Sequence, residues 1–247
     1  MAPQQGELGL HPGETMSFEV QLAGVLVGEA QLAVGEVGDV AGPAGEPRRR
    51  AIVVKSRAAT AGAAALVRKI VDEATTVIDA DTGAAISVET NVEMGDKKTV
   101  ASATFLPAYA EVKFQRSEDK QPSVFRVDTR LGKLHDAHSA MAQLRGWKAT
   151  PGTVRTVSVI GGRRLWHVEV KYVGEETIGS AAGNRRAVVY EGVSFRARRG
   201  DLKPETSKPS RKFRVWLSDD ADRVPLKVVA NTELGEVVMS LTEYSRP

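Results

Sequence analysis

Cysteine is absent from this chain of 247 residues, and aromatic residues make up only 5% of it. Without cysteine there can be no disulfide, no thiol catalysis and no cysteine-ligated metal site. With so few aromatic residues, the core must consist mainly of Val, Leu, Ile and Ala. No uncharged apolar run approaches the length of about 18 residues that a membrane-spanning helix needs, so we expect no such helix.

The amino terminus lacks a basic region followed by an apolar stretch, so we expect no signal peptide in this chain. A methionine before a polar Ala-Pro-Gln-Gln segment would also suit the start of a mature exported protein, and composition leaves the compartment open. Residues 1–13 are polar and contain Gly and Pro. We predict that they form a flexible N-terminal arm and that residues 14–247 form a single domain.

Apolar and polar residues alternate along most of the chain, which is the period of a strand with one face in a core. The pattern is clearest over residues 211–244, where we predict three antiparallel strands joined by turns at Ser218–Asp222 and Gly235. The chain contains about a dozen such strands and no alternation of strands with helices. The sequence therefore predicts an all-β fold, mainly β with two short helices, in which a single antiparallel sheet curls into a barrel or half-barrel.

Two segments break this pattern, residues 60–74 and 134–144, because their apolar residues are spaced three and four apart as in a helix. The first is predicted to have two or three turns, and could serve as a lid or plug for a cavity or simply fill the core. The second ends at Arg145 and Gly146. The apolar residues of the first helix are Ala63, Leu66, Val67, Ile70 and Val71, and those of the second are Ala137, Ala140, Met141 and Leu144.

The chain contains four histidines, and three of them are candidates for a ligand or a surface role. His135 and His138 are three apart with Asp136 between them, so a metal site with two histidines and a carboxylate is conceivable. No third ligand is spaced to join them, and we interpret both as polar residues that cap the first turn of the helix. We predict no metal and no cofactor. His167 alternates with apolar residues such as Trp166, so we expect it to face solvent.

Asp219, Asp220 and Asp222 could bind calcium, but the ligand order of an EF-hand and its closing Glu are absent. We interpret them as hairpin-turn residues, with Asp219 or Asp220 paired to Arg223. The sequence contains no Gly-rich phosphate loop after a strand and no Gly-x-Ser-x-Gly elbow. We therefore predict no catalytic residue and a protein that is not an enzyme, although carboxylates assembled by the fold would leave no sequence signature.

Positive charge is concentrated between Arg185 and Arg214, a segment that contains ten Lys or Arg residues and three acidic residues. One interpretation is contact with an anionic surface, such as lipid headgroups. The other is a solvated loop whose charges keep strand edges soluble. Nucleic acid is not expected, because aromatic residues are not interleaved with the cations. The candidate contact residues are Arg196, Arg198, Arg199, Lys203, Lys208, Arg211 and Lys212.

Three stretches occur in a suggestive order: Glu14-Thr-Met-Ser-Phe-Glu-Val with Gly24-Val-Leu-Val-Gly-Glu-Ala, then Asp136-Ala-His-Ser-Ala-Met-Ala-Gln-Leu-Arg, then Val215-Trp-Leu-Ser-Asp-Asp with Arg223-Val-Pro. In order and spacing, over residues 14–244, they resemble the bacterial family catalogued as domain of unknown function 3108. The resemblance implies a mostly antiparallel, curled β-fold in proteins commonly exported to the envelope of Gram-negative bacteria, without an established activity.

The sequence departs from that family by carrying His and Ala where its helix usually has large apolar or aromatic residues, which puts a shared ligand pocket there in doubt. The motif residues of the last hairpin suit a structural role as readily as a functional one. They are Trp216, Asp219, Asp220, Arg223 and Pro225.

These observations favour a non-enzymatic envelope protein, periplasmic or associated with the outer membrane, that binds an apolar or amphipathic ligand. A lipid or glycolipid inside the curled sheet would be such a ligand, and the basic residues would touch anionic lipid. The alternative is a structural or assembly subunit that docks on a protein partner of an envelope complex. A glycan- or ester-active hydrolase is the third hypothesis.

Overall fold

The computed structural model describes residues 8–42, 47–180 and 183–247. Its elements follow one another with short connections. In chain order they are β1 (Thr15–Leu22), β2 (Val25–Val40), β3 (Arg49–Thr60), α1 (Gly62–Val67), β4 (Ile70–Asp79), β5 (Ala85–Met94), β6 (Lys97–Phe105), β7 (Tyr109–Arg116), β8 (Ser123–Asp128), the 3-10 helix η2 (Thr129–Leu131), β9 (Leu134–His135), α2 (Ala137–Arg145), β10 (Val154–Gly161), β11 (Arg164–Ser180), β12 (Gly183–Arg196), β13 (Arg211–Ser218), β14 (Pro225–Thr232) and β15 (Gly235–Ser245).

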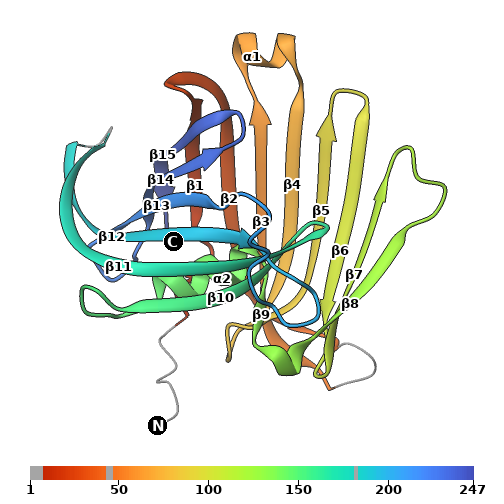
Figure 1. Cartoon of the computed structure of the whole chain (residues 1–247). Helices are drawn as coiled ribbons and strands as arrows, with labels where there is room; N and C mark the ends of the chain where they lie inside the picture. Colours follow the sequence, from red (N-terminus) through yellow and green to blue (C-terminus); the bar gives the residue numbers. More distant parts are fainter. Residues whose placement is uncertain (1–7, 43–46, 181–182) are drawn as a thin grey trace.

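The described strands form one sheet in the order β8-β7-β6-β5-β4-β3-β2-β1-β15-β14-β13-β12-β11-β10-β9. Almost every described strand pairs with its neighbour in sequence. These pairs are antiparallel, except that β9 and β10 are parallel. The first strand pairs with the last, so both ends of the folded chain meet in the middle of the sheet. In Figure 1 the strands β1–β8 stand side by side, and β10–β12 cross in front of them. The predicted fold class, a single curled antiparallel sheet with two short α-helices, is confirmed.

The sheet curls but is not closed by hydrogen bonds. In the described part of the chain its edge strands β8 and β9 share no ladder. Its two ends meet instead through a buried apolar cluster that joins β5–β8 to β9–β11 and to the loop after β12. The buried members are Val88, Ala103, Ala110, Val112, Val127, Leu134, Ile160, Leu165, Ala197 and Leu202. The burial of these side chains therefore holds the half-barrel together where backbone pairing stops.

The first predicted helix is wrong in length and in role. Only residues Gly62–Val67 are helical, and the β-branched Ile70 and Val71 begin β4 instead. The helix α1 has no buried residue, and it lies at the outer end of the β3–β4 hairpin (Figure 1). It is therefore neither a plug nor part of the core, because its apolar side chains find no apolar surface to cover.

The second predicted helix, α2, occupies the interior of the curled sheet. Its Ala142 is buried against β2, β3 and β4 with Val34, Val54 and Ile78. Its Met141 and Leu144 lie on the other side, against the cluster of β11–β13 that includes Tyr190 and Leu217. The helix therefore separates two walls of the curled sheet.

Residues 8–13 of the predicted N-terminal arm are described, and they pack against the rest of the chain. Residues 1–7 of the predicted arm lie outside the described residues. Leu8 and Leu10 pack with the apolar cluster around Ala142, and Leu10 is buried. The backbone N–H of Gly9 donates to the carbonyl of Ala142 at 3.3 Å. The described part of this segment therefore belongs to the core.

Candidate functional site

The amino-terminal end of α2 is fixed by a capping box. Asp136 is the capping residue, and its Oδ1 accepts a hydrogen bond from the backbone N–H of Ser139 at 3.0 Å. Its Oδ2 accepts from the backbone N–H of His138 at 3.0 Å, and Ser139 Oγ accepts from the backbone N–H of Asp136 at 3.0 Å. The cap predicted for the two histidines is therefore supplied by the aspartate between them.

A buried chain of polar side chains ties this cap to β3 and β4. Thr76 Oγ1 donates to Asp136 Oδ2 at 2.6 Å and lies 2.7 Å from His138 Nδ1. His138 Nε2 lies 2.9 Å from Ser56 Oγ. The threonine hydroxyl has a single hydrogen, so we infer that His138 Nδ1 donates to Thr76 and that Nε2 accepts from Ser56.

These hydrogen bonds occupy both ring nitrogens of His138, so neither is free to bind a metal ion. Burial also lowers the pKa of His138, so the ring is neutral at physiological pH. Over the described residues no group of three or more His, Cys, Asp or Glu side chains is placed to hold a metal ion. A serine that donates to a neutral imidazole is an arrangement used by activated nucleophiles. Here the imidazole is buried under α2, and the network holds the helix against the sheet.

The carboxyl-terminal end of α2 is fixed by an ion pair. Arg145 donates from its two terminal nitrogens to Glu14 at 2.6 and 2.8 Å, and these side chains are 1% and 0% exposed. The same guanidinium donates to the carbonyls of Arg223 at 3.1 Å and Asp222 at 2.8 Å. Tyr244 Oη lies 3.4 Å from Glu14 and 3.2 Å from Asp222, so its single hydrogen serves one of these two carboxylates at a time. This ion pair therefore joins α2 to the start of β1 and to the β13–β14 turn.

The predicted turn at residues 218–222 is confirmed, but its predicted ion pair is wrong. Asp220 Oδ1 accepts from Ser218 Oγ at 2.6 Å and from the backbone N–H of Arg223 at 3.1 Å. Asp219 lies 3.1 Å from Arg186, and Asp220 lies 3.5 Å from Arg185. Arg223 contacts Asp220 through its backbone N–H, and no ion pair between its side chain and either aspartate is found among the described residues; its φ of 48° is left-handed.

The other two motif residues of this hairpin also make structural contacts. Trp216 lies with its ring under Arg214, whose guanidinium carbon is 4.9 Å from the ring centroid, and under Lys227. Its Nε1 donates to Glu176 of β11. Pro225 begins β14 and is buried.

A cavity of about 330 Å³ lies on the side of α2 that faces β10–β14. Its floor is the apolar face predicted from the sequence, and its walls come from alternate residues of the strands. Gly192 helps to shape it, because a Cβ at this position would lie 2.1 Å from the Phe213 ring. The lining residues are His135, Ala137, Ala140, Met141, Gln143, Leu144, Trp147, Arg155, Val157, Val159, Val168, Val170, Phe213, Val215 and Val228.

A larger and more polar cleft of about 770 Å³ adjoins this cavity and shares His135, Gln143, Arg155 and Val157 with it. Two acids line the cleft, and both are paired. Asp81 lies 3.0 Å from Arg50, and Asp201 accepts from Arg198 at 3.1 Å. The cleft also has three cations without an ion pair in the described part of the chain. They are Lys133, Arg155 and Lys203.

His135 lies where the cavity and the cleft meet. It is buried, and burial lowers its pKa. Its Nδ1 has no hydrogen-bond partner among the described residues. The guanidinium of Arg155, which also borders both spaces, lies 4.6 Å from the centre of the Trp147 ring. A neutral imidazole and an aromatic-stacked cation therefore stand at the junction between apolar and polar surfaces.

The expectation that His167 faces solvent is wrong. Its side chain is largely covered, and its Nδ1 donates to the carbonyl of Leu202 at 3.1 Å. The loop after β12 folds over it, because Ala197 pairs with Pro204 and Leu202 is buried in the cluster that closes the sheet. The loop after β12 therefore packs against the sheet over His167 and is not a fully solvated loop.

The seven basic residues proposed for an anionic surface do not form one free patch. Arg198 is paired with Asp201, and Arg211 is paired with Glu233 at 2.8 Å. The guanidinium carbons of Arg196 and Arg211 lie 5.7 and 5.2 Å from the Trp166 ring centre, and that of Arg199 lies 3.6 Å from the Phe125 ring centre. Lys203 borders the cleft, Lys208 is exposed in the loop, and Lys212 lies on β13.

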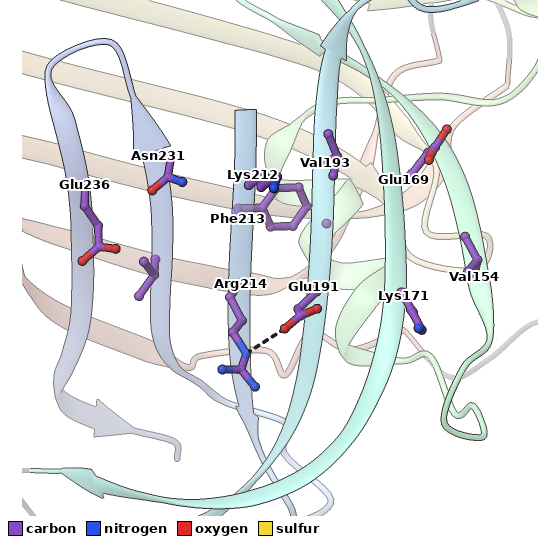
Figure 2. Close-up of a pocket in the computed structure, with 12 residues that line it drawn as sticks. Val154, Glu169, Lys171, Glu191, Val193, Lys212, Phe213, Arg214, Asn231 and Glu236 are labelled. Atoms are coloured by element: carbon purple, nitrogen blue, oxygen red, sulfur yellow. Dashed lines mark ion pairs between the residues drawn. The ribbon is translucent and has the colours of Figure 1, made fainter. Parts of the chain in front are cut away.

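Figure 2 shows Lys212 in a shallow groove of about 560 Å³ across β10–β15. Three acidic and three basic side chains border this groove, so its charges balance. Arg214 Nε lies 3.5 Å from Glu191, the pair drawn in the figure, and a terminal nitrogen of Arg214 lies 3.2 Å from Glu176. We interpret the groove as a solvated face of the sheet, because its charges balance and Arg214 pairs with Glu191.

The model of the family described as protein of unknown function DUF3108 matches residues 17–242. The chain belongs to the DUF3108 family. A search of curated proteins finds no match to it. Among solved structures, a β-barrel-like protein of the domain of unknown function DUF1849 from Brucella abortus is similar over 96% of this chain and 98% of the other, with 11% identity and a TM-score of 0.64. This likeness shows the fold alone.

Two further structures align over most of this DUF3108 chain with lower scores. A putative exported protein with a YmcC-like fold from Bacteroides fragilis has 9% identity, covers 98% and 100% of the two chains and has a TM-score of 0.40. Lipoprotein LppX from Mycobacterium tuberculosis has 13% identity, covers 94% and 87% and has a TM-score of 0.27. No helix among the described residues of this chain is long and apolar enough to cross a membrane.

Sequence reasoning found one side of the site in this DUF3108 member and missed the other. The three- and four-residue spacing of its apolar residues predicted the apolar face of α2, and this face lines the cavity. Arg155, Trp147 and Phe213 were missed because they reach the cavity from separate elements. The only available signal was the alternation of Val157 and Val159 with polar neighbours, which marks a buried strand face without saying what covers it.

Proposed function

We propose that this protein binds an amphipathic, lipid-like ligand in the cell envelope and performs no chemical step on it. The apolar part of the ligand lies in the cavity beside α2, and its anionic head lies in the adjoining cleft. The observation that carries this proposal is the apolar face of α2, which borders a cavity where packed side chains would be expected.

The size and lining of the cavity support an apolar occupant. Small-molecule sites in proteins enclose about 300–1,000 Å³, and the cavity and the cleft each fall within that range. An apolar cavity of even about 150 Å³ stays dry and takes up apolar molecules. Met141, Leu144 and Val168 would gain contacts with an alkyl chain that water cannot supply.

The charges of the cleft support an anionic head. Its acids are already paired with Arg50 and Arg198, whereas Lys133, Arg155 and Lys203 form no ion pair with any described residue. A phosphate or carboxylate placed among them would make charge-assisted hydrogen bonds. The Nδ1 of His135 would also gain the partner it lacks.

We place this activity in the periplasm or at the outer membrane, on the resemblance of the sequence motifs to exported members of the family. Fractionation of the source bacterium with an antibody against the protein tests this placement. Recovery with periplasmic or membrane markers is expected, and recovery with cytoplasmic enzymes alone would overturn it.

The binding proposal is tested by native mass spectrometry of the protein purified from its own host, followed by lipid extraction. We expect an added mass that denaturation releases as a lipid or other amphiphile. A clean apo mass under gentle conditions, together with no uptake of a long-chain fatty acid such as oleate, would overturn the proposal.

A variant links the ligand to this cavity. Ala140→Leu adds three carbons to the cavity floor, and we expect it to weaken oleate binding by about tenfold or more. Ala221→Leu makes the same change on the exposed β13–β14 turn and serves as the control. Equal oleate affinity in both variants would place the ligand elsewhere.

A further inference from the structure

The most exposed large apolar side chains of the described chain lie at the ends of hairpins, outside the cavity and the basic segment. Leu66 and Val67 of α1 are 90% and 89% exposed, Leu234 is 78% exposed, and Val25 and Leu26 are 64% and 57% exposed. The other exposed large apolar residues of the described chain range from 38% to 55%. These five therefore differ from the scattered apolar residues that any protein surface carries.

The hairpin ends that carry these residues lie next to one another. The backbone N–H of Ala23, in the β1–β2 turn, donates to Glu236 of the β14–β15 hairpin at 2.8 Å. Ala61, before α1, donates to Val27 of β2 at 2.9 Å, and Gly95 of the β5–β6 turn donates to Lys69 at 2.9 Å. Figure 1 shows α1 and these turns at one end of the molecule. We call this end the apolar tip.

Cations flank the apolar tip. Arg68 and Lys69 follow α1 directly, and Lys97 lies in the β5–β6 turn beside them. None of the three makes an ion pair within the described residues. Lys98 is paired with Glu93 at 3.2 Å, and Glu233, beside Leu234, is paired with Arg211. Asp96 and Glu236 are the remaining acids close to these turns.

The fold gives no reason for this arrangement. No residue of α1 is buried, and the strands β3 and β4 on either side of it are already fully paired with each other. A polar turn would close the hairpin equally well. An exposed apolar surface that includes a helix without a buried residue, and that has unpaired cations beside it among the described residues, is typical of an interaction surface.

We propose that the apolar tip docks on an anionic lipid surface. Leu66, Val67 and Leu234 enter the boundary between headgroups and acyl chains, and Arg68 and Lys69 contact lipid phosphates. The polar cleft lies at the opposite end of the strands, because Asp81 and Gly83 line it at the far end of β4 from α1. Membrane docking therefore uses a surface separate from the ligand cavity.

The test is flotation of the purified protein with vesicles of phosphatidylethanolamine, prepared with and without phosphatidylglycerol. We expect binding that is stronger with phosphatidylglycerol and weaker at high salt. Leu66→Ser/Val67→Ser/Leu234→Ser should weaken it by about tenfold or more. Arg68→Ser/Lys69→Ser should weaken it by roughly fivefold for each cation. Val154→Ser/Val173→Ser is the control, because these exposed valines lie on β10 and β11, outside the hairpin ends that form the apolar tip.

Three results would overturn the proposal. The first is absence of vesicle binding by the wild-type protein, and the second is binding that the triple serine variant leaves unchanged. The third is sedimentation of the protein alone as a dimer that the same variant converts to a monomer, which would make the tip an interface between copies. Oleate binding is expected to be unchanged in the triple variant, so this test and the test of the ligand cavity fail independently.

Discussion

The two sides of α2 differ in almost every respect. On the buried side, His138 and Ala142 contact β2–β4 and Arg145 contacts Glu14 and the β13–β14 turn, and the polar groups of His138 and Arg145 are hydrogen-bonded. On the side toward β10–β14, Met141 and Leu144 are half-buried and border a cavity. The first side fixes the position of the helix, and the second leaves its apolar surface available to a ligand.

This difference implies an asymmetric response to mutation. A change on the hydrogen-bonded side leaves a buried donor or acceptor without a partner, which is expensive in a low-dielectric interior. A change on the cavity side alters only van der Waals contacts with an incompletely filled space. Stability and ligand binding should therefore be separable within one short helix.

The largest effect is expected for Arg145→Met. This change leaves the buried carboxylate of Glu14 without its partner, and removing one member of a buried ion pair lowers the free energy of unfolding by about 3–5 kcal/mol. Urea unfolding followed by circular dichroism measures it. The double variant Glu14→Met/Arg145→Met should recover part of the loss. If it is no more stable than Arg145→Met alone, the unpaired charge is not the cause.

A smaller loss is expected for Thr76→Val. The methyl group cannot donate to Asp136 or accept from His138 Nδ1, so we expect a loss of about 1–3 kcal/mol in the free energy of unfolding. The control is Thr75→Val, because Thr75 lies on the opposite face of β4 and is not buried. Equal stability of the two variants in urea would show that the buried chain contributes nothing.

The free energy of unfolding should depend on pH through the two buried histidines, His135 and His138. Burial lowers the folded-state pKa of His135 and His138 below the unfolded value of about 6.5. Below that pH the unfolded chain binds more protons, so stability falls as the pH drops, by at most about 1.4 kcal/mol per pH unit for each histidine. Above pH 6.5 this contribution is constant.

The variants His138→Gln and His135→Gln check that assignment. Each should flatten the slope of unfolding free energy against pH between pH 6.5 and the folded-state pKa of the histidine it removes. A slope that is unchanged in both variants would mean that other groups titrate in this range.

The smallest effect on stability is expected for Ala140→Leu, and the matched comparison is Ala142→Leu, two residues further along the same helix. The first leucine enters the cavity and should change the free energy of unfolding by less than about 1 kcal/mol. The second is forced among Val34, Val54 and Ile78 and should lower it by about 1–3 kcal/mol. Equal losses measured in urea would show that the cavity side is as tightly packed as the other.

Local patterns predicted the elements whose neighbours in sequence are also neighbours in space. The hairpins β13–β15 and β10–β11 follow from alternation and turn residues, because each strand pairs with the next. The first helix was predicted too long because Ile70 and Val71 fit a helical spacing by chance, whereas pairing with β3 and β5 draws them into β4.

The amino-acid sequence by itself determined an antiparallel sheet with an apolar helix face, because these depend on periods of two and 3.6 residues along the chain. Only the tertiary structure decided that β1 pairs with β15, that Ser56 and Thr76 meet Asp136 and His138, and that Arg145 meets Glu14. The side chains that meet in these polar contacts are 60 to 131 residues apart in the sequence. Their meeting depends on how the whole sheet curls, and a local pattern carries no information about that.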